Sequence, residues 1–245
     1  MMCIRLPRKE RITLKEYKEQ GFFNPRARPA ADNQENSFAA RARGGGDALV
    51  DYLAFMIRQR KSFLVAGSTA TGKTSFLNLL LEMVPPHERI VCCEDTLELR
   101  IANENHVRLL EDPVNGIRLP ELVAFSLRLR PDRIVCGEAR GAEALHLIGA
   151  FHTGHPGFGS LHADSARGVF SRLEQMMRLA GRDAPSSALR SEIAQAVDVI
   201  VFIDAPYDAM TKSRTRFILE VLRVHDYENE EFKTETVYSA YGAAD

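Results

Sequence analysis

One segment of the chain has the residue types and the spacing of a phosphate-binding loop. Gly67-Ser-Thr-Ala-Thr-Gly-Lys73-Thr74 fits the pattern GxxxxGK[ST] at every specified position. It follows an apolar run and opens a helical pattern, which is the context in which this pattern binds nucleotides. Loop N–H groups and the helix end hold phosphates, the lysine reaches the β- and γ-phosphates, and Thr74 would bind Mg²⁺. We therefore expect ATP or GTP to be bound by Gly67, Ser68, Thr69, Ala70, Thr71, Gly72, Lys73, Thr74 and Ser75.

Two acidic clusters could supply the carboxylates that nucleotide hydrolysis needs. Glu94, Asp95 and Glu98 come at or soon after the end of the apolar run 90–93, and Glu138 comes after the run 134–136. Because the carboxyl ends of parallel strands meet at the edge of the sheet where ligands bind, both clusters should approach the phosphates. A solvated acidic strand end would have the same sequence, so this second interpretation stays open for each cluster.

Positive charge is concentrated in the same region of the sequence, on Arg128, Arg130, Arg133 and Arg140. Such charge can stabilise the transition state of phosphoryl transfer, as an arginine finger from the same chain or from a neighbouring subunit. Arg128 and Arg130 precede a proline, so they could instead complement the negative end of a helix. The sequence alone does not decide between these roles.

Histidine and cysteine patterns do not favour a metal centre. His152, His155 and His162 lie in a glycine-rich stretch, but neither a cysteine nor an HExxH helix joins them, so we expect no zinc. A histidine at a strand end beside the γ-phosphate could instead act as a sensor through a hydrogen bond. The four cysteines have no CxxC spacing, and three lie in apolar runs, so we expect them to fill the core.

These residues must be positioned by alternating strands and helices. Buried strands are predicted over 63–66, 90–93, 134–136, 157–162 and 197–203. Helical apolar spacing occurs over 49–56, 76–84, 142–151 and 169–180, and Pro120 marks a further helix. Such alternation predicts an α/β fold with a mostly parallel sheet. The runs 217–224 and 232–238 flank a polar turn, which predicts a C-terminal β-hairpin.

The composition of the chain limits the partners and the cellular location that we expect. The 245 residues are 27% charged with a formal net charge of -1, which gives no electrostatic reason to expect nucleic acid or anionic lipid as a bulk partner. No apolar run approaches the roughly 20 residues that span a bilayer, and the N-terminus has no apolar signal core. We therefore expect a cytoplasmic protein whose membrane association, if any, is peripheral.

Four motifs in order resemble the type II/type IV secretion ATPase family, and especially its conjugal-transfer and type IV secretion branch. They are GSTATGKT, EDTLELR, LRLRPDRIVCGEARG and TGHPGFGSLHADSA, spread over residues 47–205. They correspond to the family's Walker A loop, its acidic Asp box, its atypical Walker B motif and its His box. The resemblance implies a RecA-like P-loop core that hydrolyses Mg-ATP at subunit boundaries of a homohexameric ring. It also implies attachment to the proteins of an inner-membrane secretion or conjugation machine.

The resemblance also assigns roles by position. In it, Glu138 polarises the attacking water, the Asp-box carboxylates act through Mg²⁺ or water, and Lys73 and Thr74 bind phosphate and Mg²⁺. The implied catalytic residues are Glu138, Glu94, Glu98, Arg128, Arg140 and His162, with His155 as a further His-box residue. The implied Mg²⁺ ligands are Thr74, Asp95 and Glu138. Ala70 stands where the family usually has glycine, so a positive φ at this position would be strained.

Residues 24–46 contain prolines, arginines, alanines and three successive glycines, a composition that buries little and predicts a flexible linker. Around it, the resemblance implies a remnant of an N-terminal domain over residues 1–23 and the ATPase domain over 47–245. Because only a short leader precedes the linker, an alternative function is a nucleotide-binding scaffold that hydrolyses poorly. A DNA-dependent RecA-like ATPase is a third hypothesis. The near-neutral charge and the lack of an aromatic and basic strand-binding segment disfavour it, so we expect no direct sequence-specific binding of nucleic acid.

Overall fold

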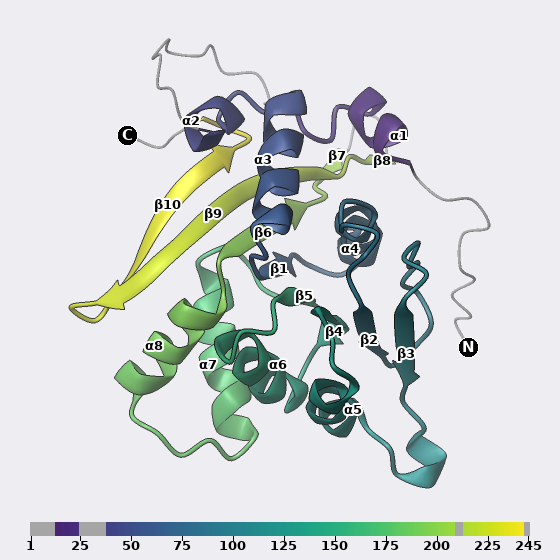
Figure 1. The fold of residues 1–245 in the computed structure, drawn as a ribbon. Helices are drawn as coiled ribbons and strands as arrows, with labels where there is room; N and C mark the ends of the chain where they lie inside the picture. The colour runs from purple at the N-terminus through teal and green to yellow at the C-terminus, as the bar shows by residue number, and fades with distance from the viewer. Residues whose placement is uncertain (1–12, 25–37, 209–212, 243–245) are drawn as a thin grey trace.

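One sheet of eight strands runs through the molecule, and helices pack on both of its faces (Figure 1). The computed structural model describes residues 13–24, 38–208 and 213–242, and every structural statement below concerns these residues. The strand order across the sheet is β10-β9-β6-β1-β5-β4-β2-β3. A separate short pair is formed by β7 (Tyr207–Asp208) and β8 (Ser213–Arg214).

Six strands of the sheet are parallel. They are β1 (Phe63–Ala66), β2 (Ile90–Glu94), β3 (His106–Leu110), β4 (Arg133–Ala139), β5 (Gly157–Leu161) and β6 (Val199–Asp204). The predicted hairpin consists of β9 (Phe217–Glu228) and β10 (Glu231–Ser239), and β9 pairs antiparallel with β6. The predicted fold class is confirmed, because the sheet is mostly parallel, flanked by helices and extended by a C-terminal hairpin.

Different helices cover the two faces of the sheet. One face carries α3 (Gly46–Arg58) and α4 (Lys73–Glu82). The other carries α5 (Leu119–Ser126), α6 (Glu143–His152), α7 (Gly168–Leu179) and α8 (Ser186–Ala196). Successive residues of β1 alternate between the two apolar cores: Phe63 and Val65 belong to the first, Leu64 and Ala66 to the second. Burial on both faces explains why the strand is apolar at every position.

The cysteines of strands β2 and β4 are core residues, as predicted. Cys92 lies in the first apolar core, whereas Cys93 and Cys136 lie in the second, so the two adjacent cysteines point to opposite faces. Burial raises the pKa of all three thiols, to about 12 for Cys93. These thiols therefore stay protonated and serve packing. Cys3 lies outside the described residues.

Strand β3 and helix α8 are among the elements that the sequence analysis did not predict. Strand β3 forms the edge of the sheet, and its side chains alternate between exposed and half-buried. An edge strand with exposed positions lacks the continuous apolar run that marks the central strands, so the sequence pattern did not predict β3. Helix α8 buries Leu189 and Ile193 four residues apart, a helical spacing within an otherwise polar segment.

Residues 13–23, the described part of the N-terminal segment, pack on the same apolar core as α3 and α4, whereas residues 1–12 lie outside the described residues. Helix α1 (Leu14–Glu19) begins at Thr13, which forms a capping box with Glu16. Phe22 and Phe23 are buried in the first core, and the ring of Phe22 stacks on Phe76 of α4 with centroids 5.8 Å apart. Phe22, in the described part of the predicted N-terminal remnant, thus touches the helix that follows the phosphate-binding loop.

The linker predicted over residues 24–46 contains a short helix near its C-terminal end. This helix, α2 (Phe38–Ala42), packs beside α3 and β10, and Ala42 is fully buried. Residues 25–37 lie outside the described residues, so for them the linker stays a prediction. Over 38–46 the chain is part of the folded structure, because burying Ala42 requires a fixed backbone there.

Candidate nucleotide site

The phosphate-binding loop connects β1 to α4, as the sequence predicts. The loop takes up residues 67–72, and α4 begins at Lys73. Gly72, the N-cap of α4, has φ 99°, a value that favours glycine. A side chain at Gly67 would place its Cβ 2.4 Å from the Ile203 carbonyl oxygen of β6. Both glycines are therefore required by the path of the backbone between two strand ends.

Ala70 adopts the left-handed conformation that its position in the loop suggests. Its φ is 65°, where an L-residue with a Cβ is strained by about 1 kcal/mol relative to glycine. The carbonyl oxygen of Ala70 accepts a hydrogen bond from Nε of Arg216 at 3.3 Å. The loop thus has the predicted strain, and a side chain from the start of β9 contacts it.

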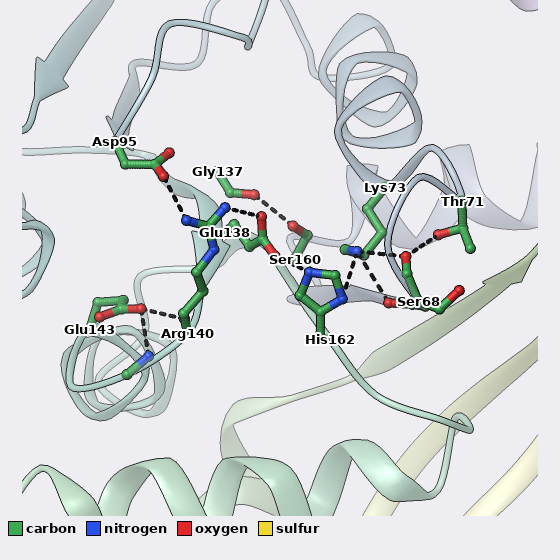
Figure 2. A network of polar contacts seen from close by, with 12 residues as sticks. Ser68, Thr71, Lys73, Asp95, Gly137, Glu138, Arg140, Glu143, Ser160 and His162 are labelled. Atoms are coloured by element: carbon green, nitrogen blue, oxygen red, sulfur yellow. Dashed lines mark hydrogen bonds and ion pairs between the residues drawn. The ribbon is translucent and has the colours of Figure 1, made fainter. Parts of the chain in front are cut away.

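Lys73 is the first residue of α4, and its side chain points towards His162, just after the end of β5 (Figure 2). Its Nζ donates to the carbonyl oxygens of Gly67 at 3.1 Å and Ser68 at 3.0 Å, and it lies 3.3 Å from Nδ1 of His162. The ammonium group has only donors, so Nδ1 must accept, and the ring proton of a neutral His162 is then on Nε2.

From His162 a line of alternating charges continues away from the loop (Figure 2). Nε2 of His162 lies 2.7 Å from Oε1 of Glu138, and Oε2 of Glu138 accepts from Nη2 of Arg140 at 2.7 Å. Nη1 of Arg140 donates to Oδ2 of Asp95 at 3.0 Å. We call Lys73, His162, Glu138, Arg140 and Asp95 the polar chain. It joins the loop, β5, β4 and the end of β2, which are far apart in the sequence.

Glu138 is the central anion of the polar chain. Its burial would raise the pKa, but the hydrogen bond and charge of Arg140 and the charges of His162 and Lys73 together lower the pKa of Glu138 below its ordinary value. The carboxylate is therefore ionised at neutral pH. Within the described structure its Oε1 makes no hydrogen bond of regular geometry, although Nε2 of His162 lies at an ion-pair distance of 2.7 Å from it. A carboxylate oxygen has more than one lone pair, so Oε1 can accept from a water molecule while His162 lies beside it.

A hollow of about 280 Å³ lies beside Glu138 and Arg140. Its lining includes three further carboxylates, from Asp95, Glu111 and Glu143. Oε1 of Glu143 accepts from the backbone N–H groups of Arg140 and Gly141 and so holds the start of the loop after β4. Nothing in the sequence had singled out Glu143, because this function depends on a turn that only the fold creates.

The structure does not bring Glu94 into the polar chain. Its side chain is 1% exposed, and Oε1 accepts from the backbone N–H groups of Glu98 and Leu99. Oε2 accepts from Arg108 of β3, with Nη2 at 2.7 Å. Glu94 thus holds the turn after β2 and ties β2 to β3. Both of its oxygens thus have partners in the fold, and the catalytic role that the resemblance implied for Glu94 stays a prediction.

Glu98, Arg128 and His155 also lie apart from the polar chain. The backbone carbonyl oxygen of Glu98 accepts from Asn78 of α4, which holds the backbone of this residue beside the helix. Arg128 is exposed on a single 3-10 turn that follows α5. Nδ1 of His155 lies 3.5 Å from the hydroxyl of Thr153. Of the predicted catalytic residues, the described structure brings together Glu138, Arg140 and His162.

The loop and the polar chain fit a magnesium nucleotide. Thr74 and Ser75 lie in the first turn of α4, where helix N–H groups face a bound anion. Among the described residues, no group of three or more His, Cys, Asp or Glu side chains could hold a metal ion by itself. Mg²⁺ in nucleotide sites is held by one or two side chains together with phosphates and water, which is compatible with Thr74 as its ligand.

Comparison with known proteins adds an independent finding. The model of the type II/IV secretion system protein family matches residues 33–227. Conjugal transfer protein TrbB of Rhizobium radiobacter is 35% identical over 184 residues, 73% of this chain and 53% of the relative. A protein of Mycobacterium tuberculosis, provisionally named a conjugal transfer protein, is 38% identical over 182 residues, 72% of this chain and 51% of the relative. The chain thus spans about half the length of these relatives.

A solved structure agrees with the sequence comparison. The VirB11 ATPase from the Brucella suis type IV secretion system, crystallised in complex with sulphate, superposes with a TM-score of 0.67 and 30% identity. The match covers 89% of this chain and 64% of that chain. The family model covers well over half of the 245 residues, including the loop and the polar chain. This chain therefore belongs to the type II/IV secretion system protein family.

Proposed function

We propose that this chain binds and hydrolyses Mg-ATP as the motor domain of a type IV secretion or conjugal-transfer machine. The observation that carries the proposal is the polar chain, because it connects the lysine of the phosphate-binding loop, through His162, to an ionised carboxylate. The similarity to an ATPase of a type IV secretion system supports the choice of ATP and of the machine.

The loop residues would bind the nucleotide first. Backbone N–H groups of residues 67–75 would surround the phosphates, and Lys73 would exchange the carbonyl oxygens of Gly67 and Ser68 for phosphate oxygens. Mg²⁺, held at Thr74, would neutralise charge on the phosphates. Since Lys73 also contacts His162, its movement towards phosphate would release that ring and so signal that the loop is occupied.

The residues of β4 would then act on the attacking water. Oε1 of Glu138 would accept a hydrogen bond from this water and orient it towards the γ-phosphate. Arg140 holds Oε2 of the same carboxylate at 2.7 Å, which fixes its orientation. The hydrogen bond to Glu138 raises the pKa of Arg140, so the guanidinium stays charged and can stabilise charge that develops on the phosphate.

The assembly of the motor is part of the same proposal. We expect a homohexamer bound to the inner-membrane proteins of the machine, with the exposed Arg128 as a candidate contact to a neighbouring subunit. In the described part of the chain, no helix has both the length and the apolar character that crossing a bilayer requires. We therefore place the motor on the cytoplasmic side, attached through its partners.

The test is the ATPase rate measured against protein concentration, with molar mass from light scattering on the same samples. We expect Mg-dependent turnover that rises as a hexamer-sized species appears. Lys73→Ala should abolish it, because the loop then lacks its only lysine. A chain that binds ATP tightly but stays monomeric and inactive would contradict the motor and favour a nucleotide-binding scaffold. Turnover that requires DNA would favour a DNA-dependent ATPase instead.

A further inference from the structure

The sheet is irregular at one point, and that point is next to Glu138. Cys136 of β4 pairs with Gly159 of β5, and the next pair is Ala139 with Leu161. Gly137 and Glu138 on β4 therefore share the place opposite a single residue of β5, Ser160. Two residues opposite one is the definition of a β-bulge, which bends a strand and redirects its side chains.

The change in side-chain direction can be seen from which apolar core the residues of β4 belong to. Side chains of a regular strand alternate between faces, so residues three apart point in opposite directions. Cys136 and Ala139 are three apart, yet both lie in the second core. The bulge has thus shifted the alternation by one residue, and Glu138 lies in the shifted part. In this orientation its carboxylate meets His162 and Arg140 rather than the apolar side chains of either core.

Ser160 bonds to the bulge directly. Its side chain is buried, with the residue 1% exposed, and its hydroxyl donates to the carbonyl oxygen of Gly137 at 2.7 Å (Figure 2). That carbonyl belongs to the peptide plane that contains the nitrogen of Glu138, so fixing one fixes the other. Gly137 has no Cβ to limit its own dihedral angles, which makes an external constraint on this peptide more important.

Ser160 also stands beside the other partner of Glu138. It comes two residues before His162 on the same strand end, and the His162 ring lies 2.7 Å from Oε1 of Glu138. One hydroxyl therefore connects the backbone that carries the ring to the backbone that carries the carboxylate. Movement of either strand end would change the distance between these two groups.

We propose that Ser160 is a positioning residue for hydrolysis: its hydroxyl holds the Gly137–Glu138 peptide in the bulge, so that the Glu138 carboxylate faces the water that attacks ATP. The inference rests on the proposed function, because it assigns Ser160 a role in that reaction. It separates ATP hydrolysis from ATP binding, because the hydroxyl of Ser160 donates to β4 and not to the phosphate-binding loop.

The experiment compares Ser160→Ala with Ser160→Thr, which keeps a hydroxyl. We measure kcat for ATP and, separately, the Kd of a non-hydrolysable ATP analogue with Mg²⁺. For Ser160→Ala we expect kcat to fall by about 10- to 100-fold, because a shift of about 1 Å at a reacting group has effects of this size. The Kd should stay within about twofold, and Ser160→Thr should regain most of the lost rate.

Ser126→Ala is the matched control. The hydroxyl of Ser126 is fully buried and donates to the carbonyl oxygen of Val123 at 2.6 Å, within helix α5 and outside the polar chain. This variant loses the same kind of hydrogen bond, so it should lower thermal stability like Ser160→Ala but leave kcat unchanged. Equal losses of kcat in both variants would overturn the inference, and so would an unchanged kcat in Ser160→Ala.

A second measurement needs no nucleotide. Thermal unfolding of the single and double variants of Ser160→Ala and Glu138→Gln tests whether the two sites are coupled, because shifts for independent sites add. We expect the double variant to lose less stability than the sum of the single losses, whereas Ser126→Ala with Glu138→Gln should be additive. Additive shifts for the first pair would contradict the positioning role. An inactive wild-type chain would instead refute the proposed function, and this cycle would still decide the role of Ser160 at the bulge.

Discussion

Glu138→Gln should change ATP turnover and ATP binding in opposite directions. The amide keeps the size of the side chain, but it removes the negative charge that lies between His162 and Arg140. General acid–base or orienting contributions of a carboxylate are typically about 10²- to 10⁴-fold in rate. We therefore expect kcat to fall at least about 100-fold, which corresponds to about 2.7 kcal/mol in the activation free energy.

The expected change in the Kd for ATP follows from the charges near the phosphate-binding loop. Glu138 is an anion that ATP must approach, and its side chain is 18% exposed, so solvent screens the repulsion only in part. Two unit charges about 4 Å apart interact by about 1 kcal/mol in water and about 4 kcal/mol at an effective dielectric constant of about 20. With the lower value, removal of the charge should tighten ATP binding about fivefold. Removal of the negative charge would also release Arg140 and His162 from Glu138, so that both side chains could face the phosphates.

The assay is single-turnover hydrolysis together with titration of a fluorescent ATP analogue, both at constant ionic strength. Glu121→Gln on the exposed side of α5 is the control, because it makes the same change of net charge away from the polar chain. A Glu138→Gln variant that keeps a kcat within threefold of the wild type would refute the assignment of Glu138. Weaker binding at unchanged kcat would show that the carboxylate organises the loop rather than the water.

Three other variants test further parts of the structure. Ala70→Gly should raise the melting temperature by about 2–4 °C, because it removes about 1 kcal/mol of strain in the loop. The control Ala54→Gly, within α3, should lower the melting temperature. A lower melting temperature for Ala70→Gly would contradict the strain at this position. His162→Ala should lower kcat about tenfold, because a lost hydrogen bond raises the activation free energy by about 1.4 kcal/mol. An unchanged kcat would show that the ring takes no part in the reaction. Burial would raise the pKa of Glu174, but hydrogen bonds, first from Arg190, lower the pKa below its ordinary value. The stability that this carboxylate contributes is therefore fully present above an unfolded pKa of about 4.3 and is lost as the pH falls through the lower folded pKa. The melting temperature of Glu174→Gln should therefore fall less on acidification than that of the wild type, and an equal fall in both proteins would contradict this.

Local sequence was sufficient for the elements that carry strong one-dimensional signals. Central strands such as β1 are buried on both faces, so their runs of apolar residues are continuous and visible without a fold. The phosphate-binding loop is equally local, since Gly67, Gly72 and Lys73 act within one turn between a strand and a helix. The edge strand β3 had no such signal, because exposure at alternate positions permits His106 and Arg108 there.

Long-range contacts decided which of the predicted site residues meet. In the sequence, Glu94 and Asp95 are adjacent acidic residues that look equivalent. In the fold, successive residues leave the strand end in different directions, so Glu94 is buried against Arg108 and two backbone N–H groups while Asp95 reaches Arg140. A choice between neighbouring carboxylates therefore required knowledge of what lies on each side of the strand.

The sequence by itself determined that this protein has a nucleotide loop, a mostly parallel sheet and carboxylates at strand ends, because each of these depends on residue type and on short-range spacing. Only the tertiary structure showed that Ser160 faces a bulge at Gly137 and that Lys73, His162 and Glu138 meet. These contacts join strands separated by an entire helix, and the bulge shifts side-chain direction by one residue. Neither the pairing of distant strands nor such a one-residue shift leaves a periodic trace in the sequence.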